Sequence, residues 1–442
     1  MNKYTPIVGL ETHIELSTST KMFCRCPRDY FNALPNTHVC PVCLGLPGAM
    51  PVANKKAVEW TIMLGMALNC TITTHSFFER KHYFYPDLPK GYQISQYQSP
   101  LCENGSLTLL NSSITVPIRR IHLEEDTGKL LHENSDDTSL IDFNRSGVPL
   151  VEVVTEPVIQ DAQTAALYLQ TLQKYVQYLG ISDADMEKGS MRCEPNISLK
   201  SQRNTGLPQY KVEVKNINSF KFVRKAIDFE LRRQENILQK GSIPAQETRR
   251  YMESNGSTVA MRQKEEAHDY RYMIEPDIPP LDLDKKMLNN LKKQVEVLDL
   301  PSKRLEKFTD MHIKKEDALL LVDDKKLGDF LLETVNLCTA EEKQTGFIQK
   351  LANYLINKKI SLPISASQFY AMAQEQSKPI QTDYVLLKKY IEEAIEKNKT
   401  AVSDYTSGNV NAINSLVGFV MKRAKGAFHA KVVLEKLKEA LS

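Results

Sequence analysis

The sequence predicts an α+β protein in which a mixed or antiparallel β body with some helices precedes an all-α region. Eighteen of the 21 prolines and 13 of the 18 glycines lie before residue 281. In that part, short alternating runs are broken by turn residues, a pattern typical of strands and loops. Beyond it, segments such as residues 386–395 carry apolar side chains at helical spacing. Pro279, Pro280 and Pro301 mark the join.

The length predicts several domains. A single core seldom grows past about 250–300 residues, so a chain of 442 residues is expected to form two to four. We predict a body over residues 1–295, a helical domain over 296–364 and a small helical tail over 365–442. Leu362-Pro363 and Lys378-Pro379 interrupt the helical pattern. The last stretch is rich in basic residues, namely Lys422, Arg423, Lys425, Lys431, Lys436 and Lys438.

Composition favours a folded cytoplasmic protein. The chain is 42% hydrophobic and 25% charged, which argues against disorder. No stretch approaches the roughly 18 apolar residues that a membrane helix needs, and the first residues lack the apolar core of a signal peptide. The net charge of +3 is too small to indicate a nucleic-acid partner unless the basic residues cluster.

Carboxylates recur on predicted strands. Alternate residues of a strand share a face, so residues 7–16 present apolar side chains on one side and polar ones on the other. The polar residues of this and three further segments are Glu11, His13 and Glu15; His122, Glu124, Glu125 and Asp126; Arg192, Glu194, Asn196 and Ser198; and Lys211, Glu213 and Lys215. One interpretation is a set of half-solvated strands. The other is that the faces converge on a site for Mg²⁺ and a nucleotide, because oxygen ligands suit Mg²⁺ and cations neutralise phosphates.

The common phosphate-binding loops are missing. The chain contains neither G-x-x-x-x-G-K-[ST] nor G-x-G-x-x-G. A nucleotide site would therefore belong to a less common fold.

Four of the eight cysteines form a cluster with metal-ligand spacing. Cys24 and Cys26 are followed, thirteen residues later, by Cys40 and Cys43. In a reducing compartment this spacing predicts a structural Zn²⁺ site, because four thiolates suit tetrahedral zinc and leave no open position. The alternative is a group of ordinary buried cysteines.

Residues 80–96 are dense in aromatic and basic side chains. They are compatible with a tyrosine-rich edge strand and loop. They are also compatible with a wall that holds a base, a ribose or the aminoacyl end of a tRNA, because bases stack on aromatic rings.

Six segments form an ordered set of motifs. Residues 8–16 read VGLETHIEL, 83–96 YFYPDLPKGYQISQ, 121–129 IHLEEDTGK, 142–152 DFNRSGVPLVE, 186–196 MEKGSMRCEPN and 213–219 EVKNINS. Over about residues 5–280 they resemble the B subunit of heterotrimeric aspartyl/glutamyl-tRNA amidotransferases. The cysteines match the branch of that family that keeps its metal.

The resemblance implies a cradle-like body, a helical domain and a tail that touches tRNA. It implies that the side-chain carboxylate of Glu-tRNA(Gln), and often Asp-tRNA(Asn), attacks the γ-phosphate of ATP. The acyl phosphate then reacts with ammonia. The implied partners are an amidase (glutaminase), which releases this ammonia from glutamine, and a small third protein that braces the pair. This chain itself contains no evident amidase machinery.

The resemblance also implies roles for individual residues. The expected catalytic residues are Glu11, His13, Glu124, Glu125, Glu213 and Lys215. The expected Mg²⁺ ligands are His13, Glu125, Glu11, Glu194 and Asn196. The expected ATP- and substrate-binding residues are Lys81, Tyr83, Tyr85, Asp87, Lys90, Gln93, Ser95, Gln96, Arg145, Glu152, Ser190, Arg192 and Asn216.

The tail departs from the family pattern. The family's G-x-I-S-x-K-x-A-K segment is missing between residues 374 and 378, and residues 407–412 (SGNVNA) replace the customary G-K-x-K-A. Residues 428–430 (FHA) replace A-N-P. Two alternatives therefore stay open: a related ATP-dependent ligase with another carboxylate substrate, and a non-catalytic, zinc-stapled RNA-binding scaffold.

Overall fold

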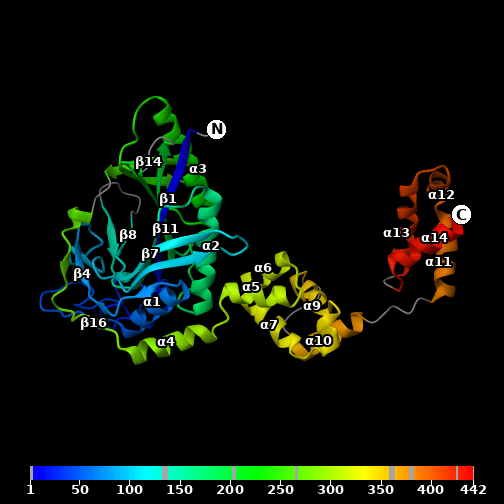
Figure 1. Cartoon of the computed structure of the whole chain (residues 1–442), viewed down its shortest axis with the longest axis horizontal. Helices are drawn as coiled ribbons and strands as arrows, with labels where there is room; N and C mark the ends of the chain where they lie inside the picture. The colour runs from blue at the N-terminus through cyan, green and yellow to red at the C-terminus, as the bar shows by residue number, and fades with distance from the viewer. Residues whose placement is uncertain are drawn as a thin grey trace. The chain divides into compact units, whose positions relative to one another are not determined.

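A computed structural model describes residues 3–131, 138–201, 206–263, 267–357, 364–377, 383–424 and 427–441. The chain divides into two compact units, Met1–Lys326 and Leu327–Ser442. The first is built around a large sheet with helices and the second is helical, which confirms the predicted α+β class (Figure 1). Among the described residues, no helix is both long and apolar enough to cross a membrane.

A nine-stranded sheet organises the first unit. Its order is β14-β13-β12-β11-β1-β10-β7-β6-β2, and every pairing is antiparallel except β12 with β13. The strands are β1 (Tyr4–Glu15), β2 (Thr71–Ile72), β6 (Cys102–Thr108), β7 (Thr115–Glu125), β10 (Pro149–Thr155), β11 (Met191–Ser201), β12 (Val212–Lys215), β13 (Glu247–Met252) and β14 (Ser257–Gln263).

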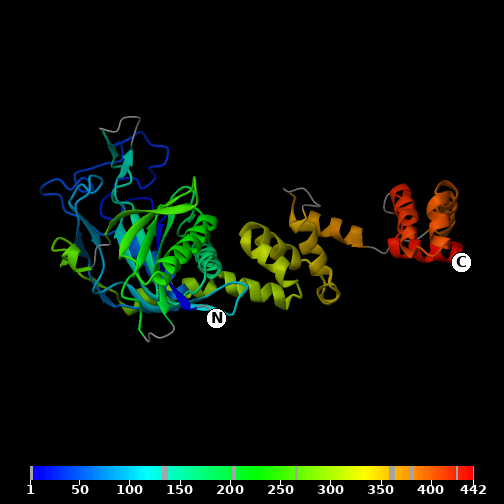
Figure 2. The ribbon, with the colours of Figure 1, turned by 90° about the horizontal axis from the view of Figure 1, so that it is seen from above.

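The apolar face of this sheet packs on helices α1 (Lys55–Ala67), α2 (Ala162–Leu179) and α3 (Phe220–Gln239). Val8, Leu10 and Ile14 of β1 point into this core and are at most 1% exposed. In both ribbon views α2 and α3 lie side by side (Figures 1 and 2). The opposite face of β1 is therefore left for the polar residues that alternate with the core residues.

Shorter elements extend one side of the polar face. Strands β4 (Glu79–His82), β5 (Tyr92–Ser95) and β15 (Met273–Ile274) form a three-stranded sheet, and η1 (Ala267–Tyr270) precedes β15. Arg80 donates to both carboxylate oxygens of Glu275 at 2.8 Å. This pairing fixes the segment around β15 against β4. The remaining strands form two-stranded sheets, β8 (Lys129–Leu131) with β9 (Leu140–Asp142) and β3 (His75–Ser76) with β16 (Leu281–Asp282).

Helices α4 (Lys285–Val297), α5 (Pro301–Asp310) and α6 (Lys315–Asp323) complete the first unit, and α7 (Lys325–Val335) begins at its end. The second unit continues with α8 (Ala340–Gln344), α9 (Phe347–Ile356), α10 (Ala366–Ser377), α11 (Tyr384–Lys397), α12 (Lys399–Thr406), η2 (Val410–Ala412), α13 (Ile413–Ala424) and α14 (Ala430–Leu441). Helices α11, α13 and α14 share a core that includes Leu387, Leu416 and Val433.

The division into two units leaves α4, α5 and α6 with the first one. The predicted breaks at Leu362-Pro363 and Lys378-Pro379, and the basic residue Lys425, lie outside the described residues. The three-domain division with borders at residues 295 and 364 stays a prediction.

Candidate active site and cysteine cluster

A cavity of about 470 Å³ lies on the polar face of the large sheet. Its lining includes carboxylates, basic side chains and tyrosines from six strands and from the segment around η1. The charged and aromatic lining residues are Glu11, His13, Lys81, Tyr83, Tyr97, Arg119, Arg120, His122, Glu124, Asp126, Glu152, Arg192, Glu194, Lys211, Glu213, Lys215, Tyr270 and Tyr272.

Strand register brings the polar side chains together. His13 on β1 lies opposite Glu152 on β10 and Arg192 on β11, while Glu152 lies opposite His122 on β7. Residues opposite one another in an antiparallel pair have neighbouring side chains. The register therefore builds a continuous polar row across four strands.

One group of possible metal ligands consists of His13, Glu124 and Glu152, with ligand atoms all within 4.8 Å of one another. His13 Nε2 lies 3.6 Å from a carboxylate oxygen of each glutamate. His122 Nε2 lies 3.1 Å from Glu152 Oε2 and braces this carboxylate. Two carboxylates and an imidazole suit a divalent cation.

The charges in this group are strongly coupled. Burial alone would lower the pKa of His13, but Glu152, Glu194 and Glu124 outweigh it and raise this pKa to about 9. Burial alone would raise the pKa of Glu152, yet His122 and His13 hold this pKa well below its usual value. A cation that binds here must displace the proton of His13.

The carboxylates Glu11, Glu194 and Glu213 form a second group, again with ligand atoms within 4.8 Å. Lys215 Nζ lies 2.8 Å from Glu194 Oε2 and 3.8 Å from Glu213 Oε2. Asn196 Nδ2 donates to Glu11 Oε1 at 3.0 Å. The Lys215 ammonium thus already offsets part of the negative charge of this group.

Lys81 extends from β4 between two aromatic rings. Its Nζ lies 4.6 Å from the ring centroid of Tyr270 and 5.7 Å from that of Tyr83. No carboxylate within the described ranges forms an ion pair with it. A partly buried ammonium without a carboxylate partner is suited to bind an anion.

Glu125 does not join the cavity. The structure brings Glu124, and not Glu125, next to His13. The expected Mg²⁺ ligand set, which included Glu125, stays a prediction. Glu125 Oε1 accepts from the backbone N–H of Ile94 at 3.0 Å and pairs with Lys90.

A bulge in β7 explains the difference. The pairing of β7 with β10 shifts register between Val154 and Thr155. Val116 and Ile118 point into the core before the shift, and Ile121 and Leu123 do so after it. Before the bulge the even-numbered residues of β7 face the core, and after it the odd-numbered residues do. Glu124 therefore lies on the polar face and enters the cavity.

Of the other predicted residues, Gln93 also lines the cavity, and several others support it or lie beside it. Ser95 Oγ donates to Glu124 Oε2 at 3.2 Å, Gln93 Nε2 to the carbonyl of Glu125 at 2.6 Å, and the backbone N–H of Leu123 donates to Gln96 Oε1 at 3.1 Å. Asp87 accepts from Thr127 at 3.1 Å.

Three predicted residues lie away from the cavity. Tyr85 is 46% exposed, and Ser190 Oγ donates to Asp183 at 2.6 Å. Asn216 lines a neighbouring pocket of about 600 Å³, together with Arg192 and Glu194.

Arg192 is held by Asp126 on the floor of the cavity. Arg145 lies 3.8 Å from the same carboxylate and donates to the carbonyls of Thr127 and Gly128 at 2.9 and 2.6 Å. Although burial opposes it, Arg192 and Arg145 lower the pKa of Asp126. Arg145 therefore acts on the cavity indirectly, through Asp126.

Several lining residues were given no role by the sequence analysis. His122 and Asp126 stand in the same motif as Glu124 and could have been found there. Tyr270 and Tyr272 alternate on a short segment, and Tyr97 stacks on Tyr272 at 4.6 Å between ring centroids. Only the fold brings that segment, almost 180 residues after β5, to the cavity.

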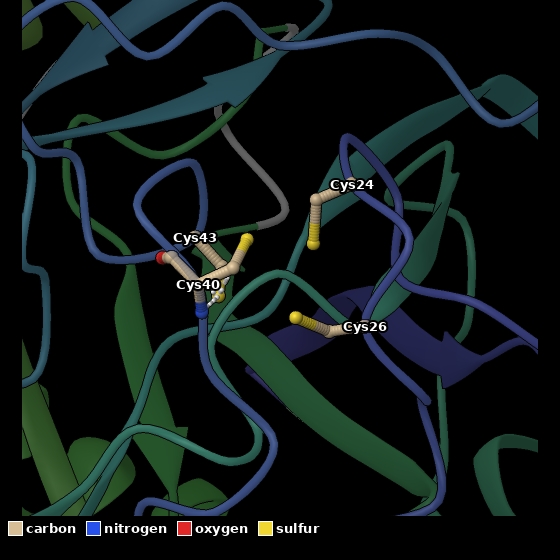
Figure 3. Close-up of side chains that lie close together, drawn as sticks. All are labelled: Cys24, Cys26, Cys40 and Cys43. Carbon is tan, nitrogen blue, oxygen red and sulfur yellow. Dashed lines mark hydrogen bonds between the residues drawn. The ribbon is translucent and has the colours of Figure 1, made fainter.

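The predicted cysteine cluster is present. The Sγ atoms of Cys24, Cys26, Cys40 and Cys43 all lie within 4.8 Å of one another and converge from two loops (Figure 3). The Sγ atoms of Cys40 and Cys43 are 3.8 Å apart. Tetrahedral zinc with bonds of about 2.3 Å requires a sulfur–sulfur separation of about 3.8 Å. The four thiols fit such a metal.

Backbone and charge also favour thiolates here. The N–H of Cys40 donates to Cys43 Sγ at 3.2 Å. A hydrogen bond from Cys24 and the charge of Lys21 outweigh burial and lower the pKa of the Cys43 thiol to about 5. Thiolates are the form that binds metals.

The cysteine loop, residues 21–46, packs directly on residues 141–147. Asn144 Oδ1 accepts from the N–H of His38 at 2.7 Å, and Asn144 Nδ2 donates to the carbonyl of Leu34 at 2.7 Å. The N–H of Met22 donates to the carbonyl of Gly147 at 2.7 Å. This segment includes Arg145, which pairs with the cavity-lining Asp126. The cysteine loop is therefore connected to the cavity through residues 141–147.

Comparison with known proteins adds an independent line of evidence. A family model described as "GatB/GatE catalytic domain" matches residues 6–289, and one described as "GatB domain" matches residues 348–441. These two matches cover most of the chain.

Three relatives are named as B subunits of aspartyl/glutamyl-tRNA(Asn/Gln) amidotransferases. That of Caldicellulosiruptor saccharolyticus is 39% identical over 480 positions, covering 99% of both chains. That of Persephonella marina is 40% identical over 480 positions, covering 99% of this chain and all of the relative. That of Thermoanaerobacter pseudethanolicus is 40% identical over 478 positions and covers both chains fully. These alignments are longer than 442 residues, so the relatives carry residues that this chain lacks.

Proposed function

Because this chain belongs to the family of B subunits of aspartyl/glutamyl-tRNA(Asn/Gln) amidotransferases, we propose that its cavity activates the side-chain carboxylate of a mischarged aminoacyl-tRNA with ATP. The activated carboxylate is then amidated with ammonia, giving Gln-tRNA(Gln), Asn-tRNA(Asn) or both. The chain works in the cytoplasm, together with the amidase and the small bracing protein of a three-protein complex.

One observation carries this proposal. The cavity combines a cluster of possible metal ligands with basic side chains, among them Lys81, Arg192 and Lys215, around a space of about 470 Å³. A carboxylate is a weak, anionic nucleophile and must approach an anionic phosphate. Positive charge fixed around the reacting groups lowers the barrier for such a step.

His13, Glu124 and Glu152 would hold Mg²⁺, which when bound polarises a phosphoryl oxygen and neutralises developing charge. The second group differs, because Lys215 is already seated among its carboxylates. Lys81 is the cation best placed to contact the phosphoryl group during its transfer to the carboxylate, since two tyrosine rings flank it and no carboxylate of the described ranges pairs with it.

The reaction proceeds in two steps. A carboxylate oxygen of the aminoacyl group forms a bond to the γ-phosphorus as the bond to the β-phosphate oxygen breaks, and ADP leaves. Ammonia then adds to the carbonyl carbon of the acyl phosphate. The amide forms as inorganic phosphate leaves and the nitrogen loses a proton to solvent.

We also propose that the cysteine cluster binds one structural Zn²⁺. All four positions around the metal would be filled by thiolates, which leaves no site for a reacting water. The convergence of the four sulfurs within 4.8 Å, with 3.8 Å between those of Cys40 and Cys43, supports this assignment.

The decisive experiment is reconstitution. The chain is co-expressed with a candidate amidase and a candidate bracing protein, and end-labelled Glu-tRNA(Gln) and Asp-tRNA(Asn) are tested for amidation with ATP, Mg²⁺ and glutamine. We expect conversion of at least one, with ADP formation that depends on the mischarged tRNA. A complex that hydrolyses glutamine but converts neither tRNA would overturn the proposal and favour another carboxylate substrate.

A further inference from the structure

Lys21 is a buried cation that the reaction does not use. Its side chain is fully shielded from solvent, and it is among the largest completely buried side chains. Its ammonium donates to Cys43 Sγ at 3.7 Å and to the carbonyl of Phe143 at 3.3 Å. In the described parts of the chain, no carboxylate pairs with it. The anionic group closest to it is a thiolate of the cysteine cluster.

The charges of the cluster explain why a lysine is placed there. Zn²⁺ with four thiolates carries a net charge of −2, and a buried net charge is unfavourable unless an opposite charge lies nearby. A lysine without an anion would be equally unfavourable in the same place. Each charge therefore stabilises the other.

We propose that Lys21 is the counter-ion of the metal–thiolate centre and joins that centre to residues 141–147, the segment that carries Arg145. The inference rests on the proposed occupancy of the cysteine cluster by a metal. The ammonium holds Cys43 on one side and Phe143 on the other, two residues before Arg145. A Cβ atom on Gly147 would lie 3.5 Å from both Lys21 Cδ and Cys43 Cβ, so the lysine stem fills the space between the two segments.

The first test is zinc release from the purified three-protein complex to a colorimetric chelator. We expect Lys21→Met to release zinc at least tenfold faster than the parent protein, because its side chain has similar bulk and no charge. Lys55→Met is the matched control, since that lysine is largely exposed and pairs only with Glu59 on the same helix. An unchanged release rate in Lys21→Met, with one zinc bound, would overturn the proposal.

A spectrum separates a counter-ion from a packing residue. With Co²⁺ in place of zinc, a hydrogen bond from an ammonium lowers the energy of the sulfur lone pairs. The sulfur-to-cobalt charge-transfer band should therefore move to longer wavelength in Lys21→Met. A purely structural role for Lys21 predicts no movement of this band.

A measurement on the unaltered protein covers the case in which Lys21→Met does not fold. Lysine acylation is followed by mass spectrometry before and after chelation of the metal. We expect Lys21 to be modified only after the metal is removed, and equal modification in both states would contradict the proposal. If the parent complex contains no metal at all, the proposed zinc site itself is wrong. A complex that binds zinc, but whose zinc release does not depend on Lys21, would contradict only the role of Lys21.

Discussion

The cavity and the cysteine cluster both gather possible metal ligands, but they do so in opposite ways. The cluster draws four sulfurs from about twenty residues of turns. The cavity draws His13, Glu124 and Glu152 from three strands, the first of them more than a hundred residues before the others. The cluster is local and the cavity depends on the whole sheet.

The two regions also differ in how their charge is balanced. Histidines, Lys215 and Arg192 already lie among the carboxylates of the cavity, so a metal there exchanges with existing cations. A single lysine faces the cysteine cluster within the described residues. This difference suits an exchangeable ion that binds together with ATP in the cavity, and a permanently bound ion in the cluster.

The largest expected effect tests the cavity itself. Glu124→Gln should lower kcat/KM for tRNA-dependent ADP formation by about 10³-fold, or about 4 kcal/mol, because it removes a charged ligand from the reacting groups. Glu125→Gln is the control, since this neighbour faces Lys90 and not the cavity. We expect it to retain this activity within about tenfold. Equal losses in the two variants would show that the bulge in β7 is misassigned.

The next effect is a pH dependence that belongs to the cavity. A chelator keeps metal out of the site during the measurement. Burial alone would lower the pKa of His13, but the surrounding glutamates raise it from 6.5 to about 9. Its stabilisation is therefore fully present below pH 6.5 and is lost as the pH rises through about 9. The shift corresponds to roughly 3 kcal/mol.

This contribution is measured as the difference in free energy of unfolding between the parent protein and His13→Asn across about pH 6 to 10. The difference should shrink as pH rises over that range. A difference independent of pH would mean that His13 is not held in its charged form.

A smaller effect tests the segment, residues 141–147, that connects the two regions. Asn144→Ala should lower the free energy of unfolding by about 2 kcal/mol, because it leaves the N–H of His38 and the carbonyl of Leu34 without their buried partner. Asn36 bonds the same segment from an exposed position, at Ile141 and Phe143. Asn36→Ala should lower the free energy of unfolding clearly less than Asn144→Ala in the same denaturation experiment. A larger loss for Asn36→Ala would contradict the assigned burial of Asn144.

The smallest effect concerns Gly147, whose φ of +86° disfavours any side chain. Gly147→Ala should lower the free energy of unfolding by about 1 kcal/mol through the strained backbone conformation. Steric overlap should add little, since the nearest atoms to the added Cβ lie at an ordinary 3.5 Å. Gly180→Ala, at φ +69° with open space around it, provides the comparison in thermal unfolding. A much larger cost at Gly147 would show that Lys21 and Cys43 cannot yield to the added methyl group.

The sequence predicted the two regions unequally, and the reason is physical. Spacing alone located the four cysteines, because their convergence needs only two loops that are close together in the sequence (Figure 3). Alternation along β1 correctly separated Glu11 and His13 from Val8 and Leu10. Alternation could not separate Glu124 from Glu125 on β7, because a bulge changes the face of a strand without a distinct residue signature.

Residue pairs that are brought together by the strand order could not be predicted from the sequence. Nothing local links Tyr270 to Lys81, or Asp126 to Arg192. Lys21 was also missed, since a lysine next to a cysteine motif is usually a solvated surface residue. Its burial follows only from the packing of residues 141–147 over the loop.

The position of β1 also determines when this protein can fold during synthesis. Both neighbours of β1 come much later in the chain, β10 at Pro149–Thr155 and β11 at Met191–Ser201. At roughly 5–20 residues per second, the ribosome needs about 10–40 s before the second neighbour emerges. The four cysteines can converge once the first fifty residues have been made, whereas both edges of β1 remain unpaired until β10 and β11 emerge. The nascent chain is therefore most exposed to aggregation, and to chaperones that recognise unpaired strands, well before its cavity exists.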